Sequence, residues 1–182
     1  GDACKGSSYV GGGYFSSCGR YRFWHYGTSA KRKSIAFLEG DTFVFTCGDL
    51  MSGWRGCMVN FGEDNQSWLG AGKKGASGVE DFGQLCRVSF AQQVQGGFIA
   101  RMFWLPSEEN VEADHLSRDR ENLFLESVVE RDVLLEGAVL QRHPRCGEVR
   151  RLPDYSKDVV AGALHQLDDG YSSNSLKDGP RQ

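Results

Sequence analysis

Four acidic residues, Asp2, Glu39, Asp64 and Asp114, lie far apart in the sequence, and each is near the end of a separate predicted element or on its face. Mg²⁺ prefers carboxylate oxygens and retains waters, so a few acids suffice to bind it without histidine or cysteine. Two such ions about 3.5–4 Å apart can stabilise the attacking water, the phosphoryl oxygens and the leaving 3′ oxygen during phosphodiester hydrolysis. We therefore predict that these four residues are catalytic and bind two Mg²⁺ ions, with Mn²⁺ as a substitute.

Four acids at one site would repel one another, and two neighbouring acids could take the place of predicted ligands. Acids packed this closely repel one another, so the cluster should destabilise the fold without metal, and at least one pKa should be raised. Asp41 is close to Glu39 in the sequence, and Glu63 directly precedes Asp64. If the predicted elements are shifted in register, Asp41 would replace Glu39 as a ligand, or Glu63 would replace Asp64.

The elements that must position the acids follow from composition and periodicity. Short aromatic runs separated by glycines predict hairpin strands in residues 1–26. Further along the chain the patterns predict strands at 57–61 and 98–105, helices at 64–69 and 79–95, and a helix from Val111 onward. Strands that alternate with helices in this way indicate an α/β layered domain with a mixed sheet.

Residues 34–50 are ambiguous in the sequence. Ile35, Leu38, Thr42 and Phe45 recur at helical spacing, which predicts a helix that carries Glu39. The run from 42 to 46 nevertheless has strand propensity, and Gly40 is a poor helix residue. We predict a helix, because the spacing extends over the whole segment.

The stretch from Trp104 to Arg118 reads W-L-P-S-E-E-N-V-E-A-D-H-L-S-R. It resembles the last motif of the ribonuclease H domain of retroelement reverse transcriptases, W-x-P-S-E-x-N-x-A-D-x-L-S-R. Three weaker similarities precede it in the family's order: Asp2-Ala3-Cys4 with the glycines that follow, the helix motif ending at Glu39, and Asp64-Asn65 with a downstream Lys74-Gly75-Ala76-Ser77. The resemblance covers roughly residues 1–130.

The resemblance implies a ribonuclease-H-like three-layer fold in residues 1–130, with a mixed five-stranded sheet flanked by helices. Residues 131–182 are expected to be a helical and then largely disordered C-terminal extension, with the change in composition beginning at about Pro144 and disorder from Leu167. The implied activity is metal-dependent endonucleolytic cleavage of the RNA strand of RNA–DNA hybrids.

The resemblance also implies substrate contacts and partners. Such a nuclease would contact 2′-hydroxyls across a wide minor groove. Asn65 and Gln66, beside the metal site, are candidate strand contacts, and Lys73, Lys74 and Ser77 are candidate phosphate contacts. The expected partners are an RNA–DNA hybrid and an upstream reverse transcriptase domain of the same polyprotein.

The chain departs from the family at two points. Many members carry a histidine in the loop before the last helix, whereas residues 98–114 contain none, which lowers the expected turnover. The sequence begins at Gly1, one residue before Asp2, although the family's first strand starts several residues earlier. The sequence is therefore expected to be a fragment of a longer polyprotein, in which a short first strand would hold Asp2 loosely.

Composition limits the remaining possibilities. The 182 residues carry a formal net charge of −3, so nucleic acid would have to be bound by local basic groups or metal ions. Six scattered cysteines without a C-x-x-C pair favour free thiols over disulfides. With no apolar run of membrane-spanning length and no signal peptide, we expect an intracellular protein, in cytoplasm or nucleus.

Two other functions remain open from the sequence. A ribonuclease-H-like domain that has lost catalysis could connect neighbours within a polyprotein, and the short first strand and acidic net charge favour it. An unrelated small intracellular binding domain could carry the motif by chance. The spatial arrangement of the four acids bears directly on this choice.

Overall fold

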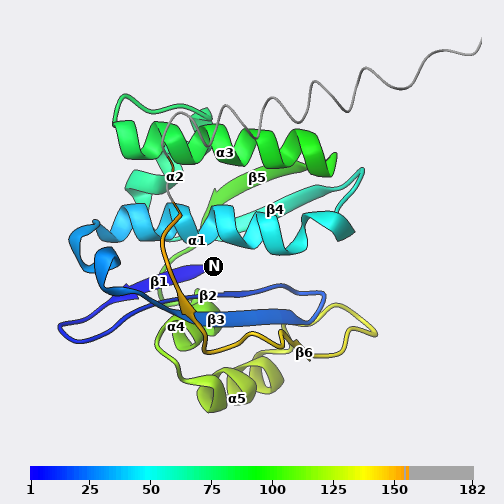
Figure 1. Ribbon diagram of the computed structural model, residues 1–182. Coiled ribbons are helices and arrows are strands. Elements are labelled where there is room, and N and C mark those ends of the chain that lie inside the picture. The colour runs from blue at the N-terminus through cyan, green and yellow to red at the C-terminus, as the bar shows by residue number, and fades with distance from the viewer. Residues whose placement is uncertain (154, 156–182) are drawn as a thin grey trace, which may run out of the picture.

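The computed structural model describes residues 1–153 and Tyr155, and within this part of the chain five α-helices accompany two β-sheets (Figure 1). The larger sheet contains both antiparallel and parallel pairs. The protein is therefore a mixed α/β protein with a mixed sheet, as the sequence predicts. The disorder predicted from Leu167 onward lies outside the described residues.

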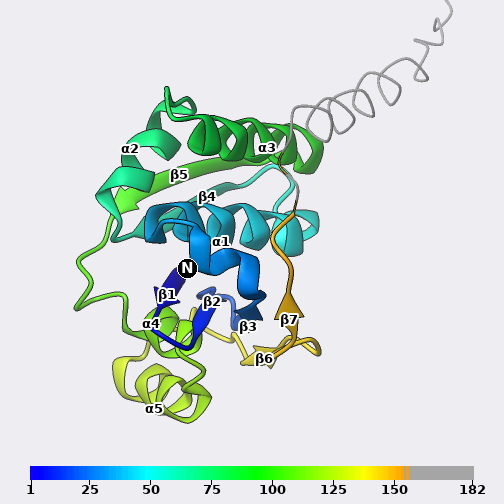
Figure 2. The ribbon, with the colours of Figure 1, turned by 60° about the vertical axis from the view of Figure 1, so that its left-hand side comes forward.

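The larger sheet begins with an antiparallel meander of β1 (Asp2–Lys5), β2 (Val10–Phe15) and β3 (Arg20–Tyr26). Two short strands, β6 (Gln141–Arg142) and β7 (Val149–Arg150), then pair with β3 in parallel. The meander is the hairpin arrangement that the glycine-separated aromatic runs predict. The far C-terminal strands close the outer edge of the sheet, next to β3 (Figure 2).

The smaller sheet consists of β4 (Met58–Glu63) and β5 (Ile99–Trp104), which pair in parallel. This arrangement differs from the single five-stranded sheet that the family resemblance implies. The physical reason lies in β1, whose four residues pair with only the first four residues of β2. Within the described residues β1 is the edge of the larger sheet, and no strand pairs with both β2 and β4.

Helices α1 (Ile35–Leu50), α2 (Gln66–Lys74) and α3 (Glu80–Gly96) lie on one side of the larger sheet, and α4 (Val111–Ser117) and α5 (Glu121–Arg131) lie on the other (Figures 1 and 2). Two 3₁₀ turns, η1 (Thr28–Arg32) and η2 (Met51–Gly53), flank α1. In this layering α1 packs against β1 and β2 of the larger sheet and contacts β4 of the smaller one through Phe43 and Phe61.

Helix α1 resolves the ambiguity of residues 34–50 in favour of a helix. The Ser34 side chain caps it by accepting a hydrogen bond from the Phe37 N–H at 3.1 Å. Most of the helix is buried, including Phe43 and Val44 from the segment with strand propensity. Burial against both sheets therefore outweighs the local strand preference of these residues.

Glycines in β2 allow two neighbours to lie directly on the strand. A Cβ at Gly12 would come within 2.6 Å of the Trp24 ring, and one at Gly13 would come within 2.7 Å of Leu116 Cβ on α4. Neither distance is possible for a real side chain, so any larger residue would displace one of these neighbours. The glycine run thus fixes how closely α4 approaches the sheet.

The segment after Val111 differs from the single helix predicted there. The chain breaks between α4 and α5 at Asp119, which adopts a left-handed φ of 56°. Beyond α5, the described residues 132–153 form β6, β7 and connecting loops instead of the expected helical continuation. These strands are held by β3 in the larger sheet, a long-range pairing that local sequence patterns do not encode.

The cysteines and the hydropathy of the helices were both considered in the sequence. All six cysteines are unpaired, as the sequence favours. In the described part of the chain, no helix has the length and apolar character needed to cross a membrane.

Candidate metal centre

Three of the four predicted acids meet at one point. Carboxylate oxygens of Asp2, Glu39 and Asp64 all lie within 4.8 Å of one another. They come from the start of β1, from the amino-terminal part of α1 and from the loop between β4 and α2. These oxygens are close enough together to bind one hard divalent cation, and three carboxylates are the donor type that Mg²⁺ prefers.

Backbone and side-chain hydrogen bonds hold the first two acids. The Ala3 N–H donates to Glu39 Oε2 at 3.0 Å, so the first strand positions the carboxylate on α1. The Ser117 hydroxyl, at the end of α4, donates to Asp2 Oδ2. Asp2 and Glu39 are both buried, whereas Asp64 is half-buried and gives the cluster its access to solvent.

The third acid is positioned by a strand end and a helix start. Asp64 follows the last residue of β4, and Asn65 caps α2 by accepting hydrogen bonds from the Ser67 and Trp68 N–H groups. This cap fixes the turn from strand to helix in which Asp64 lies. The side chain is thereby directed toward the carboxylates of β1 and α1.

Burial, and then the proximity of the acids to one another, raises their pKa values. Burial, together with the charges of Asp64 and Asp114, raises the pKa of Asp2 to about 7, although the Ser117 hydrogen bond and the terminal ammonium act in the opposite direction. Burial and the charges of Asp2, Glu63 and Asp64 hold the pKa of Glu39 well above its usual range. A divalent cation would remove this penalty by neutralising the repulsion.

The predicted fourth acid, Asp114, lies near the cluster but is engaged elsewhere. Its charge contributes to the raised pKa of Asp2. Ser117, whose hydroxyl donates to Asp2, lies one helical turn beyond it, 3.1 Å from the Asp114 carbonyl oxygen. Asp114 Oδ1 accepts a hydrogen bond from Arg118 Nε at 2.7 Å, one helical turn further along. The structure therefore brings Asp2, Glu39 and Asp64 together and leaves Asp114 at their border.

Glu63 is a fifth acid at this site, considered in the sequence only as an alternative to Asp64. It ends β4 and is buried, and its Oε1 accepts a hydrogen bond from the Asn65 N–H at 3.0 Å. Burial raises its pKa to about 8, against the opposing effect of the terminal ammonium. The sequence offered one signal for Glu63, which is that it directly precedes Asp64 at the end of a predicted strand. Because neighbouring side chains of a strand point to opposite faces, this pattern could not show that both acids approach the cluster.

Asp41, the other alternative, does not belong to the centre. It is fully buried and forms an ion pair with Arg150 of β7, with Arg150 Nη2 3.1 Å from Asp41 Oδ1. The hydroxyl groups of Tyr26 and Tyr155 also donate to its carboxylate. The charge of Asp41 is thus already neutralised within the protein. The acid of α1 that joins the cluster is Glu39.

The predicted substrate contacts lie along α2, at different distances from the acids. Asn65 uses its side-chain oxygen to cap the helix, and Gln66 is exposed one residue further on. Lys73 and Lys74 are exposed at the other end of α2, which at 1.5 Å per residue is roughly 12 Å away. The Ser77 hydroxyl accepts a hydrogen bond from the Val79 N–H in the following loop.

Surface hollows accompany these residues. Gln66 and Lys73 line one together with Trp104, while Lys74 and Ser77 line another on a neighbouring face of α2. Asn65 and Gln66 thus directly follow Asp64 of the acid cluster, whereas the two lysines lie at the other end of α2.

The raised pKa values give a stability prediction. Asp2 and Glu63 bind protons up to about pH 7 and 8 in the folded state but only to about pH 4 when unfolded. Without metal, the free energy of unfolding should therefore fall as the pH rises through this window, by at least about 1 kcal/mol. Mg²⁺ binds the deprotonated acids and should restore most of the loss.

Urea unfolding with EDTA or Mg²⁺, at about pH 5 and about pH 8, measures both effects. The Asp64→Asn variant serves as the control, because it removes one of the repelling charges and should show a weaker pH dependence. Equal stability with and without Mg²⁺ at the higher pH would contradict a metal centre here.

Comparison of the chain with protein-family models, with curated proteins and with solved structures finds no match. The geometry of the acids and the motifs quoted above are therefore the two observations on which a function can be argued.

Proposed function

We propose that the protein belongs to the class of divalent-metal-dependent phosphodiester hydrolases, with Asp2, Glu39 and Asp64 as the metal-binding residues. The observation that supports this most strongly is the convergence of three carboxylates from three elements within 4.8 Å. Within the described residues no lysine or arginine forms an ion pair with these three acids. Buried carboxylates without a cationic partner are costly, and a bound cation would offset this cost.

More particularly, we propose a retroelement ribonuclease H domain that cleaves the RNA strand of RNA–DNA hybrids. The motif from Trp104 to Arg118 and the order of the acids along the chain support this narrower assignment. The separation of β4 and β5 from the larger sheet differs from the family's single five-stranded sheet, but the mixed α/β layering is compatible with it.

In this proposal each residue has a defined task. Asp2 and Glu39 are the buried ligands, positioned by hydrogen bonds from the Ser117 hydroxyl and the Ala3 N–H respectively. Asp64 is the half-exposed ligand, next to which a phosphate can approach. Bound Mg²⁺ would supply Lewis-acid stabilisation of the phosphoryl charge and of a nucleophilic water. Asp114 stays within electrostatic reach and could add a carboxylate if its contact with Arg118 opened.

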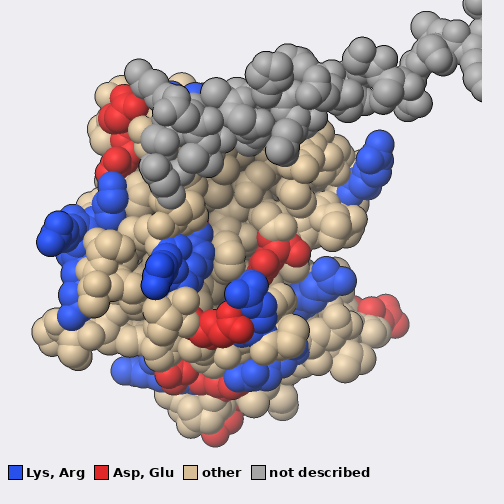
Figure 3. All heavy atoms as spheres, in the orientation of Figure 1, with Lys and Arg blue, Asp and Glu red and all other residues tan. Residues whose placement is uncertain are grey.

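Substrate contacts follow from the surface around the cluster. Gln66 is exposed next to Asp64 and is suited to hydrogen bonding with a sugar 2′-hydroxyl or a base edge. Lys73 and Lys74 would contact phosphates further along the strand. On the face in Figure 3, acidic and basic side chains are interspersed, so we expect local contacts and metal ions, more than a broad basic surface, to hold the hybrid.

Cleavage of end-labelled substrates tests the proposal. Water attack on phosphorus with loss of the 3′ oxygen leaves a 5′-phosphate and a 3′-hydroxyl, unlike the cyclic phosphate that 2′-hydroxyl attack produces. We expect cleavage of the RNA strand of a hybrid with Mg²⁺ or Mn²⁺, none with EDTA, and little on double-stranded DNA or RNA. Hybrid left intact under all metal conditions would contradict the proposed activity.

A second candidate is a ribonuclease-H-like module without catalysis, and the ion pair between Asp114 and Arg118 favours it. This contact, at 2.7 Å, places a guanidinium at the border of the cluster. A protein that binds Mg²⁺ at the three acids but leaves every substrate intact would fit this candidate and not the nuclease.

The same ion pair yields a prediction about metal binding. Replacing Arg118 by methionine keeps the aliphatic side chain, removes a positive charge near Asp2 and frees Asp114. Because exposed ion pairs contribute about 0.5–1 kcal/mol, Mg²⁺ affinity should rise by about two- to fivefold.

Isothermal titration with Mg²⁺ measures this change in affinity. Arg101→Met, at an exposed position of β5, is the matched control and should leave the affinity unchanged. Equal affinity of the Arg118→Met variant and the wild type would show that Asp114 takes no part in metal binding.

A further inference from the structure

A hollow of about 340 Å³ lies between α2 and the end of β5. Its lining residues are Trp104, the last residue of β5, and Gln66, Leu69, Gly70 and Lys73 of α2. The four α2 residues recur at intervals of three and four, so they share one face of the helix. The hollow therefore combines an aromatic ring, an amide and an ammonium group, which together can hold a nucleotide by stacking, hydrogen bonding and charge.

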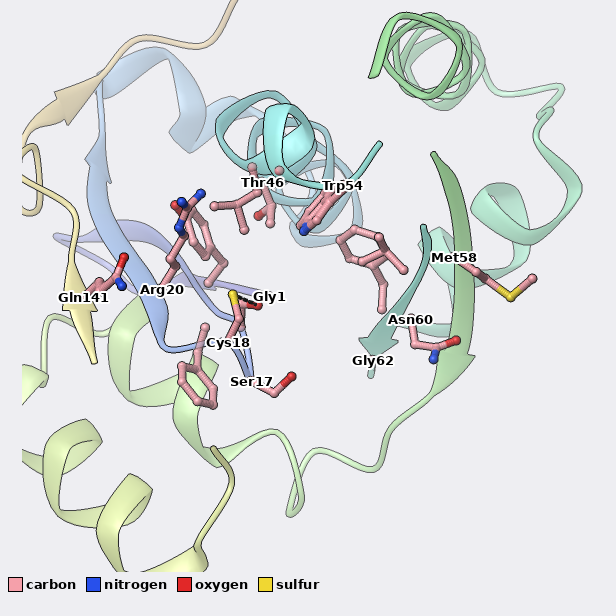
Figure 4. A pocket seen from close by; sticks show the side chains of 17 residues that line it. Gly1, Ser17, Cys18, Arg20, Thr46, Trp54, Met58, Asn60, Gly62 and Gln141 are labelled. Carbon is pink, nitrogen blue, oxygen red and sulfur yellow. Dashed lines mark hydrogen bonds between the residues drawn. The ribbon is translucent and has the colours of Figure 1, made fainter. Parts of the chain in front are cut away.

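The Trp104 ring is open to a ligand. It is 43% exposed, more than the other three tryptophans, of which Trp24 and Trp68 are fully buried. Trp54 is half-buried and lines a separate slot that Gly1 also lines (Figure 4). Each of these three rings packs against another aromatic ring, whereas Trp104 has no aromatic neighbour among the described residues.

The hollow borders the acid cluster. Trp104 is the register partner of Glu63, which directly precedes Asp64, and the backbones of paired strands are about 4.8 Å apart. Gln66 lies two residues beyond Asp64, and Lys73 is roughly 10 Å further along α2 at 1.5 Å per residue. A nucleic acid strand with a phosphate at Asp64 could therefore continue into the hollow.

We propose that the hollow binds one unpaired nucleotide next to the hybrid, with its base stacked on Trp104 and its phosphate beside Lys73. Bases inside a duplex already stack on one another, so only an unpaired base can present its face to the indole ring. Stacking on an aromatic ring tolerates any base, since every base has a π-face. The duplex held at Asp64 rests on the proposed function, whereas stacking itself requires neither metal nor hydrolysis.

The other lining residues suit a nucleotide. A Cβ at Gly70 would meet no atom within 4 Å, so α2 leaves open space in the middle of this face. The Gln66 amide can both donate to and accept from a base edge or a sugar hydroxyl. Lys73 is exposed and forms no ion pair within the described residues, so its ammonium group is free to contact a phosphate.

Binding of a labelled oligonucleotide of about five deoxythymidines, followed by fluorescence anisotropy in EDTA, tests the stacking without cleavage. Trp104→Leu removes the aromatic ring and should weaken binding at least about fivefold. Trp104→Phe keeps a smaller ring and should retain most of the affinity. Trp54→Phe is the matched control at the tryptophan of the separate slot and should bind like the wild type.

Quenching of tryptophan fluorescence identifies the ring that the base contacts. The oligonucleotide should quench the wild type and Trp54→Phe, but not Trp104→Phe, in which Trp24 and Trp68 are both buried. Equal affinity of the wild type and Trp104→Leu, or quenching that persists in Trp104→Phe, would overturn the proposal.

The phosphate contact has its own readout. Lys73→Met should lower the salt dependence of oligonucleotide binding by about one unit of the logarithmic slope, because one fewer counterion is released. Lys31→Met, at an exposed position of η1, is the matched control and should leave the slope unchanged. Equal slopes for Lys73→Met and the wild type would remove Lys73 from the site.

Hybrids with and without unpaired nucleotides test the position of the site. In EDTA, a hybrid with unpaired deoxythymidines at one end of its DNA strand should bind at least about fivefold more tightly than a blunt hybrid, and Trp104→Leu should abolish the difference. Equal affinity of the wild type for both hybrids would refute a site next to the duplex. Preserved discrimination together with an intact hybrid in Mg²⁺ would instead contradict only the nuclease activity.

Discussion

The Asp64→Asn variant is expected to lose RNA–DNA hybrid cleavage by roughly 10²- to 10³-fold, since it replaces a charged metal ligand by a neutral group of the same size. Asp64 is the half-exposed member of the cluster, where the metal and the phosphate would meet. The loss should appear in the rate of the chemical step, measured by single-turnover cleavage of a labelled hybrid at saturating enzyme.

The same substitution should stabilise the metal-free protein. Asp64 raises the pKa values of Asp2 and Glu39 through charge repulsion, so its neutral counterpart relieves part of this cost. The expected gain in the free energy of unfolding is about 1 kcal/mol at a pH near 8 with EDTA. Lower activity together with higher metal-free stability is typical of a functional acid and not of a damaged fold.

A matched control uses the same change at an unrelated position. Asp132 is exposed just beyond α5 and has a left-handed φ of 47°, which asparagine also accepts. The Asp132→Asn variant should therefore retain the activity and stability of the wild type. Equal residual cleavage by the wild type and Asp64→Asn would assign the activity to something other than this cluster and would refute the proposed role of Asp64.

Much of the candidate centre could be predicted because its signals are local. A strand end, a capped helix start and an amphipathic spacing each place one acid, and the order of the acids along the chain adds to these signals. The helical spacing of residues 35–45 predicted α1, even though residues 42–46 favour a strand, and the structure shows that Ser34 caps its start. Glu39 then lies beside Asp2 because α1 packs on β1.

The remaining features depend on distant contacts that the sequence does not show. Arg118 and Asp114 are one helical turn apart, a spacing that permits an ion pair but does not require one. The pairing of β7 with β3 joins residues more than a hundred positions apart. Likewise, the division of the strands into two sheets, with β1 at the edge of the larger one, depends on strand pairing that a pattern of alternating residues cannot specify.

Asp41 shows how two buried acids on one helix can have opposite roles. Asp41 lies two residues beyond Glu39 on α1, and it forms an ion pair with Arg150 and accepts hydrogen bonds from two tyrosine hydroxyls. Glu39, in contrast, accepts a hydrogen bond from one backbone N–H. The guanidinium of Arg150 also lies 4.1 Å from the centre of the Phe45 ring, against the same helix. This network holds β7 and Tyr155 against α1.

Replacing Asp41 by alanine is therefore expected to lower the free energy of unfolding by about 3–5 kcal/mol, because it leaves a buried guanidinium and two hydroxyl groups without their acceptor. Urea unfolding at neutral pH measures the loss. Asp81→Ala provides the comparison, since Asp81 pairs with Lys33 at a similar 2.8 Å but on the surface, where the expected loss is under about 1 kcal/mol.

The Asp41→Asn variant separates charge from packing in this network. Asparagine keeps the size of the side chain and one acceptor oxygen, so a loss close to that of alanine would show that neutralising Arg150 is the dominant contribution. Glu39→Gln should change stability in the other direction when metal is absent, because it removes a charge that its neighbours repel. If both variants destabilised the metal-free protein equally, Glu39 would be a structural acid like Asp41, and the case for a metal centre at this end of α1 would fail.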